Sequence, residues 1–441
     1  MEGNRTEFTG RRLRVVCLLV SALLLSGCAK TDPVLSQAAS QTVPLDEGAP
    51  VAGGNGAAME VAAATKAVAK ATAAQMEEAA AYRKQARAIV SDMDDAALAA
   101  QVIIAGLDGN IHLSDGMKRL LQNSPPGAIM LFSYNLKADK RTARSFLKEC
   151  VDAVAEKSVA PFLAVDHEGG RVHRFGPDVR RLPSAESYWR RTLAVDREQA
   201  LNEIESQAFA SGTEIHDVGV TMNFAPVAEI LTKENARFLG ARSYGPDPVF
   251  VEAACAAFIR GMERSGVACV VKHFPGNADV DPHEASPALA ADKETLDYMV
   301  KPFAGLIRAA PQVAQPAAVM VSHVVAQARD AERPASLSPL IINGWLREEL
   351  GFAGIAAADD FSMGAVAASG IKAEAAALTA LNAGIDMVMA WPPDLASTHK
   401  AILAALKTGG VRRDRLEEAA ERIIFQKLRF GLVRMEDEQF Q

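Results

Sequence analysis

A series of short apolar runs recurs through this 441-residue chain and constrains its fold more than any other feature. Each run is about five residues long and mostly apolar rather than alternating, and most are separated by thirty or more residues that contain helix-period sequence. This pattern is typical of parallel strands covered by helices. The eight runs are Val102–Gly106, Ala128–Phe132, Pro161–Val165, Val220–Phe224, Val267–Val271, Ala318–Ser322, Gly354–Ala358 and Asp386–Ala390.

Eight strand–helix units over about 340 residues predict an α/β protein with a (β/α)8 TIM-type barrel. An open doubly wound sheet fits less well, because no glycine-rich G-x-G-x-x-G turn follows the first strand. We therefore expect one barrel domain over residues 91–436. The composition agrees with this expectation, since a chain that is 49% hydrophobic and 23% charged can bury a full core.

The charge balance argues against a nucleic-acid partner. The formal net charge is -7, and Lys and Arg gather in a cluster only near the N-terminus. A basic groove is therefore not expected. We expect a partner that is neutral or small.

The N-terminal segment has the order of a secretion signal. Three arginines within Arg11–Arg14 precede the apolar stretch Val15–Leu25, which is too short to span a bilayer comfortably. The segment Leu25–Cys28 resembles the bacterial lipoprotein processing box. We expect residues 1–27 to be a signal peptide and Cys28 to carry the lipid that anchors the protein to a membrane of the cell envelope, on the periplasmic or extracellular face. An uncleaved signal anchor or a fortuitous cysteine is the alternative.

Two segments of biased composition separate this signal from the barrel. Residues 28–56 are rich in Ser, Gln, Pro, Gly and Ala and predict a flexible tether. Residues 57–90 are dominated by strong helix formers without Gly or Pro, and they predict an Ala-rich helical stalk. Ser91 with Asp94 predicts a capping box at the start of the globular part.

The remaining cysteines, Cys150, Cys255 and Cys269, fit neither a disulfide framework nor a zinc site, because they are odd in number and widely spaced. We expect them to be core residues. No metal motif such as His-Glu-x-x-His is present in the sequence, and we expect neither a metal nor a cofactor.

Ionisable side chains follow several of the predicted strands directly. In a barrel of this kind the carboxyl ends of the strands converge on one mouth, so these residues are expected to form one site and to make the chain an enzyme. Taken singly, each is equally consistent with a solvated strand end or a helix cap. They are Asp166, Lys272, His273, His323, Asp359 and Asp360.

Several sequence blocks, most of them at the ends of the predicted strands, resemble the motifs of a known family. The segment Ala164–Phe175 is similar to the aspartate-glutamate-glycine-glycine-arginine motif of family 3 glycoside hydrolases, in the bacterial β-N-acetylglucosaminidase branch. Further blocks occur in the expected order, and the similarity runs from about residue 91 to about residue 432. These blocks are Asn223–Val227, Arg242–Pro248, Lys272–Gly276, Pro334–Pro339 and Asp359–Met363. The resemblance implies a barrel with its site at the mouth, without the second α/β domain of many relatives.

The resemblance also implies catalytic roles. Asp359 is implied as the nucleophile of a retaining glycosidase, with Asp360 as its structural neighbour; Ala358 stands where relatives have serine. His283, oriented by Asp281, is implied as the general acid/base. The loop that carries this pair departs from the common pattern of the branch: it is two residues shorter and reads Gly276-Asn277-Ala278 where Gly-His-Gly is usual.

Substrate-binding roles carry over in the same way to Asp166, Arg174, Arg242, Lys272 and His273, which are implied to hold the hydroxyls and the acetamido group of the sugar. Other roles stay open at single positions. Arg174, together with Arg171, is equally able to brace the carboxylate of Glu168, and His273 to be a packed strand-end residue.

The sequence therefore predicts a lipid-anchored, exo-acting and retaining β-N-acetylglucosaminidase. It would act on terminal N-acetylglucosamine of cell-wall fragments, chitin oligomers or glycoconjugates. The alternatives are a phosphorylase of the same substrates, a β-glucosidase of the same family, and a sugar-binding lipoprotein without turnover. The natural glycan and the oligomeric state are left open.

Overall fold

The computed structural model describes residues 54–194, 196–278, 288–309, 315–361 and 371–434. The chain divides into two compact units, Met1–Glu78 and Ala79–Gln441. A single helix, α2 (Gly54–Ser91), covers the range in which the sequence predicts a helical stalk. Its residues Ala86 and Val90 are buried in the core of the second unit. The boundaries of signal, tether and stalk stay predictions.

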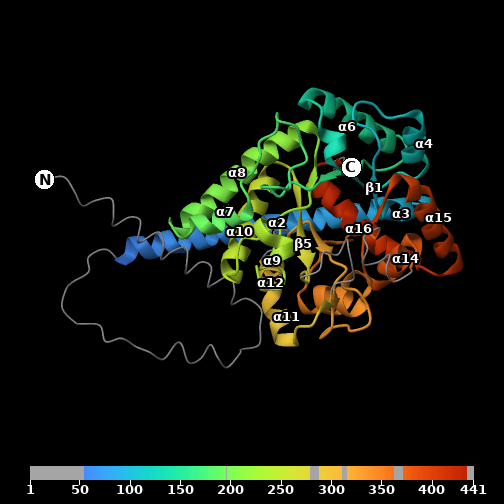
Figure 1. The fold of residues 1–441 in the computed structure, drawn as a ribbon. Helices are drawn as coiled ribbons and strands as arrows, with labels where there is room; N and C mark the ends of the chain where they lie inside the picture. The colour runs from blue at the N-terminus through green and yellow to red at the C-terminus, as the bar shows by residue number, and fades with distance from the viewer. Residues whose placement is uncertain (1–53, 195, 279–287, 310–314, 362–370, 435–441) are drawn as a thin grey trace, which may run out of the picture. The chain divides into compact units, whose positions relative to one another are not determined.

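All eight apolar runs form strands, and the predicted barrel is confirmed (Figure 1). The strands are parallel and lie in the order β10-β1-β2-β3-β4-β5-β7-β9. A parallel bridge between Ala357 and Met387 joins the last strand of this order to the first. Their bounds are β1 Ile103–Gly106, β2 Ala128–Leu131, β3 Phe162–Val165, β4 Met222–Asn223, β5 Ala268–Phe274, β7 Ala318–Val321, β9 Ile355–Ala358 and β10 Val388–Ala390. A separate parallel pair joins β6 (Ala288–Leu289) and β8 (Val325–Ala326).

Helices between the strands cover the outside of the barrel, as the alternating pattern predicts. The helices α8 and α10 pack closely, because Gly261 has no side chain: a Cβ there would lie 2.4 Å from the carbonyl oxygen of Glu205. The bounds of the helices after α2 are α3 Asp95–Gln101, α4 Asp115–Asn123, α5 Ser133–Leu136, α6 Lys140–Ala155, α7 Ala185–Arg191, α8 Arg197–Val218, α9 Ala236–Leu239, η2 Gly240–Arg242, α10 Pro248–Arg264, α11 Lys293–Met299, α12 Lys301–Arg308, η4 Ala335–Leu337, the π-helix η5 Leu340–Glu349, α14 Ala373–Ala383, α15 Pro392–Thr408 and α16 Arg413–Arg429.

The predicted capping box at Ser91 is wrong. The N-cap of α3 is Asp94, whose side chain accepts from the backbone N–H of Ala97 at 2.8 Å. Ser91 is instead the last residue of α2, and its hydroxyl donates to the carbonyl oxygen of Ala88 at 2.7 Å. The hydroxyl therefore satisfies an acceptor of the preceding helix rather than a donor of the next one.

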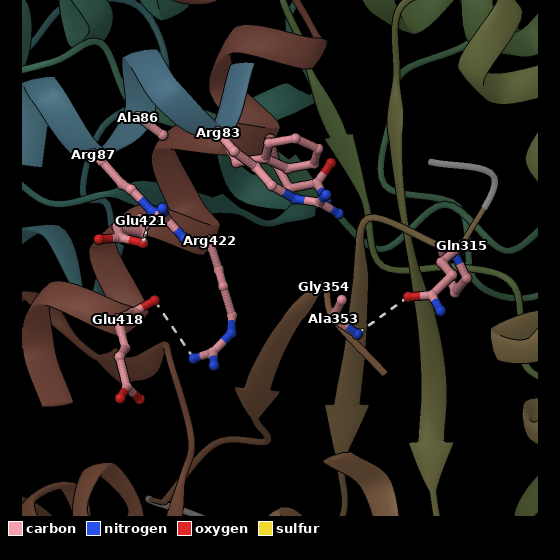
Figure 2. Close-up of a pocket in the computed structure, with 12 residues that line it drawn as sticks. Arg83, Ala86, Arg87, Gln315, Ala353, Gly354, Glu418, Glu421 and Arg422 are labelled. Atoms are coloured by element: carbon pink, nitrogen blue, oxygen red, sulfur yellow. Dashed lines mark hydrogen bonds and ion pairs between the residues drawn. The ribbon is translucent and has the colours of Figure 1, made fainter. Parts of the chain in front are cut away.

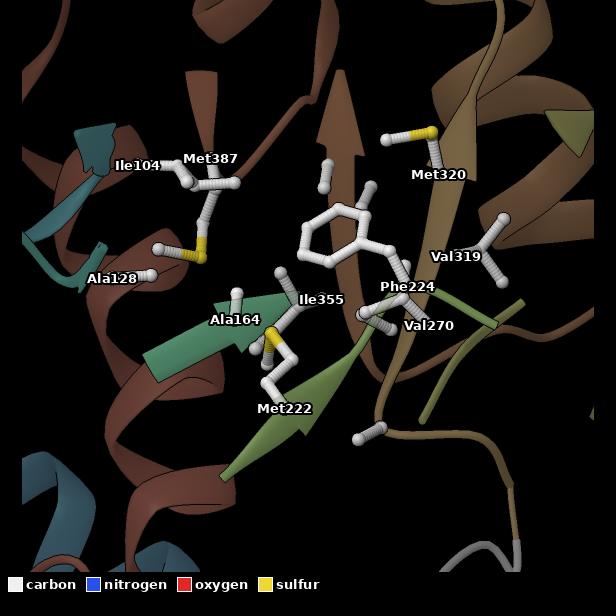
Figure 3. Close-up of a cluster of buried hydrophobic side chains, with 14 of the residues drawn as sticks. Ile104, Ala128, Ala164, Met222, Phe224, Val270, Val319, Met320, Ile355 and Met387 are labelled. Atoms are coloured by element: carbon white, nitrogen blue, oxygen red, sulfur yellow. The ribbon is translucent and has the colours of Figure 1, made fainter. Parts of the chain in front are cut away.

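The barrel interior is filled by apolar side chains (Figure 3). Met222 and Phe224 from the region of β4 lie there with Val270 of the neighbouring β5 and Ile355 of β9, and all four are fully or almost fully buried. Cys150, Cys255 and Cys269 are free and buried, which confirms their expected place in the core. Within the described ranges no helix combines the length and the apolar character needed to cross a membrane.

A buried ion cluster lies where the chain enters β10. Asp386 has no exposed surface, and its carboxylate is bound by Arg347 at 2.5 Å, Arg415 at 2.8 Å and Arg422 at 3.0 Å. Burial alone would raise the pKa of Asp386, but the three guanidinium groups outweigh it and lower the pKa to about 2. The carboxylate is therefore ionised and joins η5, α16 and the barrel wall.

Candidate active site

A hollow of about 260 Å³ lies at the carboxyl ends of the strands. All six of the predicted catalytic and binding side chains that the structure describes line it: Asp166, Arg174, Arg242, Lys272, His273 and Asp359. Its lining contains four carboxylates, four Arg or Lys side chains and one His, and its apolar part is Met130, Phe132, Val172, Phe238, Met320, Met389 and Trp391. Residues far apart in the sequence meet here because the strands that carry them end at the same mouth.

Lys272 is the centre of a buried ion network. It extends from the end of β5, and its Nζ lies 2.5 Å from Oδ1 of Asp166 and 2.7 Å from Oε1 of Glu168. Burial would lower the pKa of Lys272, but the charges of the two carboxylates raise it above its ordinary value. The ammonium group is therefore held in its charged form between two anions.

Glu168 is held on its other side by Arg242. The guanidinium binds both carboxylate oxygens, with Nε–Oε2 and Nη2–Oε1 distances of 2.8 Å each. Burial would raise the pKa of Glu168, yet Lys272 and Arg242 together hold it far below its usual range. Glu168 thus orients two of the predicted substrate-binding cations, a function that the sequence did not reveal.

The alternative that Arg171 and Arg174 brace Glu168 is wrong. Arg171 donates to the carbonyl oxygen of Phe238 at 2.9 Å, and Arg174 lies 3.5 Å from Oδ2 of Asp166. The Nε of Arg174 is buried and has no hydrogen-bond partner among the described residues. The Arg174 side chain as a whole is 31% exposed and lines the hollow, so the rest of the side chain, not Nε, faces it.

His273 is oriented by a second buried carboxylate. Its Nδ1 lies 2.6 Å from Oε1 of Glu229, and its Nε2 lies 3.4 Å from Nη2 of Arg242. Glu229 also accepts from the backbone N–H of Asn277 at 2.6 Å and from its side-chain amide at 3.0 Å. With Nδ1 at Glu229, the other ring nitrogen, Nε2, lies beside Arg242 on the side of the hollow. Glu229 lies six residues beyond the end of β4, so the search for polar residues directly after strands missed it.

Asp359 is the carboxylate at the end of β9. Burial would raise its pKa, but the nearby His323, His273 and Lys272 outweigh that effect, and the pKa lies below its ordinary value. The backbone N–H of Asp360 donates to its Oδ1 at 2.9 Å. The group is thus ionised and held in place at the mouth, as a carboxylate nucleophile must be.

Two more residues position the turn that follows Asp359. His323 lies after β7, and its ring nitrogens are 2.7 Å from the hydroxyl of Ser336 and 3.0 Å from the carbonyl oxygen of Asp360. The indole Nε1 of Trp391 donates to Oδ2 of Asp360 at 2.9 Å. Trp391 directly follows the eighth apolar run, and the strand-end rule would have identified it if the rule had been applied to aromatic residues as well.

Three predicted residues cannot be placed. Asp281 and His283, the implied acid/base pair, and Cys28, the implied lipid site, lie outside the described residues. The described chain stops at Ala278, just after Asn277, which is bound to Glu229 beside the hollow.

A second hollow, of about 200 Å³, lies at the opposite end of the strands (Figure 2). Gln315 and Gly354, which precede β7 and β9, line it together with residues of α2 and α16. Its carboxylate Glu421 is 3.4 Å from Nε of Arg87. Catalytic groups of such barrels stand at the carboxyl ends of the strands, so we take the mouth as the candidate active site. Across the described ranges no group of three or more His, Cys, Asp or Glu is placed to hold a metal ion.

The comparisons with known proteins agree with the motifs. Residues 92–425 match the model of the glycosyl hydrolase family 3 N terminal domain. The chain is 35% identical over 280 residues to a beta-hexosaminidase of Methylococcus capsulatus, covering 63% of this chain and 79% of that protein. It is 34% identical over 282 residues to a beta-hexosaminidase of Stenotrophomonas maltophilia, covering 62% and 79%.

Solved structures with this fold include enzymes of the same kind. A family 3 β-N-acetylglucosaminidase of a Paenibacillus species has a TM-score of 0.71 at 28% identity, covering 78% of this chain and 65% of that chain. A β-N-acetylhexosaminidase of Beutenbergia cavernae has a TM-score of 0.67 at 26% identity, covering 76% and 99%. This chain therefore spans slightly less than two thirds of the first of these structures and nearly all of the second.

Proposed function

This chain belongs to glycosyl hydrolase family 3, and on that premise we propose that it is a retaining, exo-acting β-N-acetylglucosaminidase. The observation that carries the proposal is the ionised carboxylate of Asp359, which faces the network of Lys272, Asp166, Glu168 and Arg242 in a hollow at the barrel mouth. The beta-hexosaminidase names of the curated relatives support the choice of sugar.

In the first step an oxygen of Asp359 attacks the anomeric carbon of the terminal sugar as the glycosidic C–O bond breaks. The leaving oxygen takes a proton, which we assign to the imidazolium of His283. The product is a glycosyl ester of Asp359. In the second step the neutral imidazole takes a proton from water, the water oxygen bonds to the anomeric carbon, and the carboxylate of Asp359 leaves. Two inversions give net retention.

The proposed roles in binding follow from the contacts. Asp166 keeps acceptor capacity beyond its bonds to Lys272, and Arg174 lines the hollow with a side chain that is 31% exposed, so both suit sugar hydroxyls. Arg242, Lys272 and His273 complete the set of fixed donors and acceptors around the ring and its acetamido group. Because Glu168 and Glu229 already hold these side chains, they need little reordering when the sugar binds.

The role of His283 with Asp281 rests on the motif alone. A histidine acid/base whose ring is held by a carboxylate titrates near neutral pH, which suits both steps. If His283 supplies the proton, His283→Ala lowers kcat more for alcohol leaving groups than for activated phenols. An equal loss for both kinds of leaving group contradicts the assignment.

The test of the proposed function uses an aryl β-N-acetylglucosaminide and the variant Asp359→Asn. We expect kcat to fall by at least about a thousandfold, because the covalent step is lost. Asp178→Asn, at an exposed carboxylate outside the hollow, is the matched control and keeps the wild-type rate. A slow fluorinated N-acetylglucosaminide should add its mass to the peptide that carries Asp359. A wild-type rate in Asp359→Asn overturns the nucleophile assignment.

The same assay separates the alternatives. Sugar 1-phosphate formed only when phosphate is present indicates a phosphorylase, and faster turnover of the aryl glucoside indicates a β-glucosidase. Binding of N-acetylglucosamine without turnover of any glycoside indicates a sugar-binding protein.

We further propose that residues 1–27 are cleaved and that Cys28 carries the lipid that holds the enzyme to the cell envelope. The sequence features of the N-terminus support this, and terminal sugars of envelope fragments would then be within reach. Cys28→Ser should move the activity from the membrane fraction to the soluble fraction and abolish labelling by a fatty-acid probe. Membrane retention of that variant overturns the anchor.

A further inference from the structure

Three neighbouring aromatic rings, of which the outer two are stacked and the inner one is tilted by 50°, lead from the hollow to the protein surface. Trp391 and Phe132 both line the hollow, and their ring centroids are 5.1 Å apart. Phe132 is stacked in turn on Tyr134, with centroids 5.9 Å apart and ring planes 5° from parallel. Tyr134 is 45% exposed. One face of its ring lies against Phe132, and much of the remaining ring surface is open to solvent.

The backbone that carries the Tyr134 ring is anchored by the next residue, Asn135. Tyr134 lies in the one-turn helix α5, directly after β2, and the next residue, Asn135, is fully buried. The side chain of Asn135 accepts from the backbone N–H of Phe132 at 2.9 Å and donates to the carbonyl oxygens of Leu107 at 3.0 Å and Gly109 at 2.7 Å. These bonds anchor the backbone of α5 at the rim, and the contact with Phe132 orients the Tyr134 ring.

The ring is also uncharged at physiological pH. Partial burial raises the pKa of the Tyr134 phenol, and the nearby charge of Asp108 raises it further. A neutral and exposed aromatic face is suited to stacking against a flat, partly apolar ligand.

The innermost of the three rings lies beside the reacting atoms. The indole of Trp391 is bonded to Asp360, the residue after the proposed nucleophile. The hollow itself, at about 260 Å³, is smaller than the pockets that enclose a drug-sized ligand. Its size suits one terminal sugar, so the group joined to that sugar lies toward the rim. Tyr134 is the exposed ring that continues the aromatic lining of the hollow outward.

We propose that Tyr134 is the platform for the leaving group of the substrate, and that this leaving group is a hexopyranose ring. An equatorially substituted pyranose presents apolar C–H groups on its faces, and these bury area against an aromatic ring. Tyr134 thereby determines specificity for glycans over glycosides of small alcohols. The inference rests on the proposed function, because it assumes that the terminal sugar occupies the hollow.

The experiment compares two substrates that share the terminal sugar. One is the β-1,4-linked disaccharide of N-acetylglucosamine, and the other is N-acetylglucosaminyl fluoride, which has no leaving ring. We measure the ratio of their kcat/KM values in the wild type, Tyr134→Ala and Tyr134→Phe. The ratio should fall about tenfold in Tyr134→Ala, mainly through KM for the disaccharide, and stay within about twofold of wild type in Tyr134→Phe.

Tyr298→Ala is the matched control. Tyr298 is 42% exposed on α11 and stacks beneath the ammonium group of Lys301. It lines no part of the hollow, and its removal should leave the ratio at the wild-type value.

Each outcome decides the proposal. A wild-type ratio in Tyr134→Ala overturns it, and a loss in Tyr134→Phe as large as in Tyr134→Ala assigns the effect to the hydroxyl and overturns the stacking. If the wild type hydrolyses neither the fluoride nor the aryl glycoside, the proposed function fails instead. Calorimetry then tests the platform separately: Tyr134→Ala must weaken binding of the disaccharide more than binding of the monosaccharide.

Discussion

Some side chains that line the hollow are held in position by charged residues that need not contact the substrate. Glu168 is the clearest case, because it is bound by both Lys272 and Arg242 and has little exposed surface. Without its charge the two cations would repel each other at close range in a poorly hydrated site. The placement of the donors proposed to hold the sugar therefore depends on a residue behind them.

Glu168→Gln tests this dependence. The variant keeps the shape of the side chain and removes its charge, so we expect the free energy of unfolding to fall by about 3 kcal/mol and kcat/KM to fall at least about tenfold. Urea unfolding and steady-state kinetics measure the two effects. Glu205→Gln is the control, because Glu205 pairs with two surface arginines, Arg260 and Arg264, and its loss should cost about 1 kcal/mol or less. If Glu168→Gln and Glu205→Gln lose similar amounts of unfolding free energy, the buried charge of Glu168 contributes no more than a surface ion pair.

Secondary-structure elements are joined at the other end of the barrel by Asp386. Arg347 reaches it from η5, and Arg415 and Arg422 reach it from α16, while the backbone N–H of Ala356 in β9 donates to it at 2.9 Å. One carboxylate thus fixes two helices to the barrel wall at the position where β9 and β10 meet.

Asp386→Ala should destabilise this junction. The change leaves three guanidinium groups near one another without their shared counter-charge, and we expect a loss of about 3–5 kcal/mol in the free energy of unfolding. Denaturant titration measures it. Asp414→Ala, which removes the exposed partner of Arg412 at the start of α16, should leave the unfolding midpoint at its wild-type value. A midpoint for Asp386→Ala equal to that of the control would show that the cluster is dispensable.

At the scale of the whole molecule, the last helix is joined to the first helix of the barrel by a buried lysine. Lys427 of α16 has no exposed surface, and its Nζ donates to Oε1 of Gln101 in α3 at 2.6 Å. Burial without a counter-charge lowers the pKa of Lys427 to about 7. The folded barrel therefore binds this proton less tightly than the unfolded chain does.

The sign of the resulting pH dependence follows from proton linkage. Between about pH 7 and the ordinary lysine pKa of 10.5 the unfolded chain holds the proton and the folded protein does not, so Lys427 makes stability rise with pH. Lys427→Met removes this contribution. The difference in unfolding free energy, variant minus wild type, should fall by up to about 1.4 kcal/mol per pH unit over that window. Lys148→Met is the control, at an exposed lysine paired with Asp152, and its difference in unfolding free energy should not change with pH. If the difference for Lys427→Met does not change with pH either, the buried amine titrates normally and the prediction is wrong.

The sequence predicted the barrel and the members of its site for a simple physical reason. Asp166, Lys272 and Asp359 each belong to or directly follow an apolar run, and parallel strands bring such positions together. The sequence did not predict which cation binds Glu168, because Glu168 and Arg242 are 74 residues apart and meet only through the geometry of the closed barrel. The sequence also did not reveal the role of Glu229, because Glu229 lies beyond the end of β4 and its partner His273 belongs to the neighbouring strand, β5.

The equal numbers of carboxylates and of Arg or Lys side chains around the hollow have one more consequence. The charges of these side chains largely cancel, and the glycan of the proposed function is itself uncharged, so its approach is not steered by charge and depends little on ionic strength. With the proposed export to the cell envelope, capture of the substrate would stay nearly constant as the external salt concentration changes.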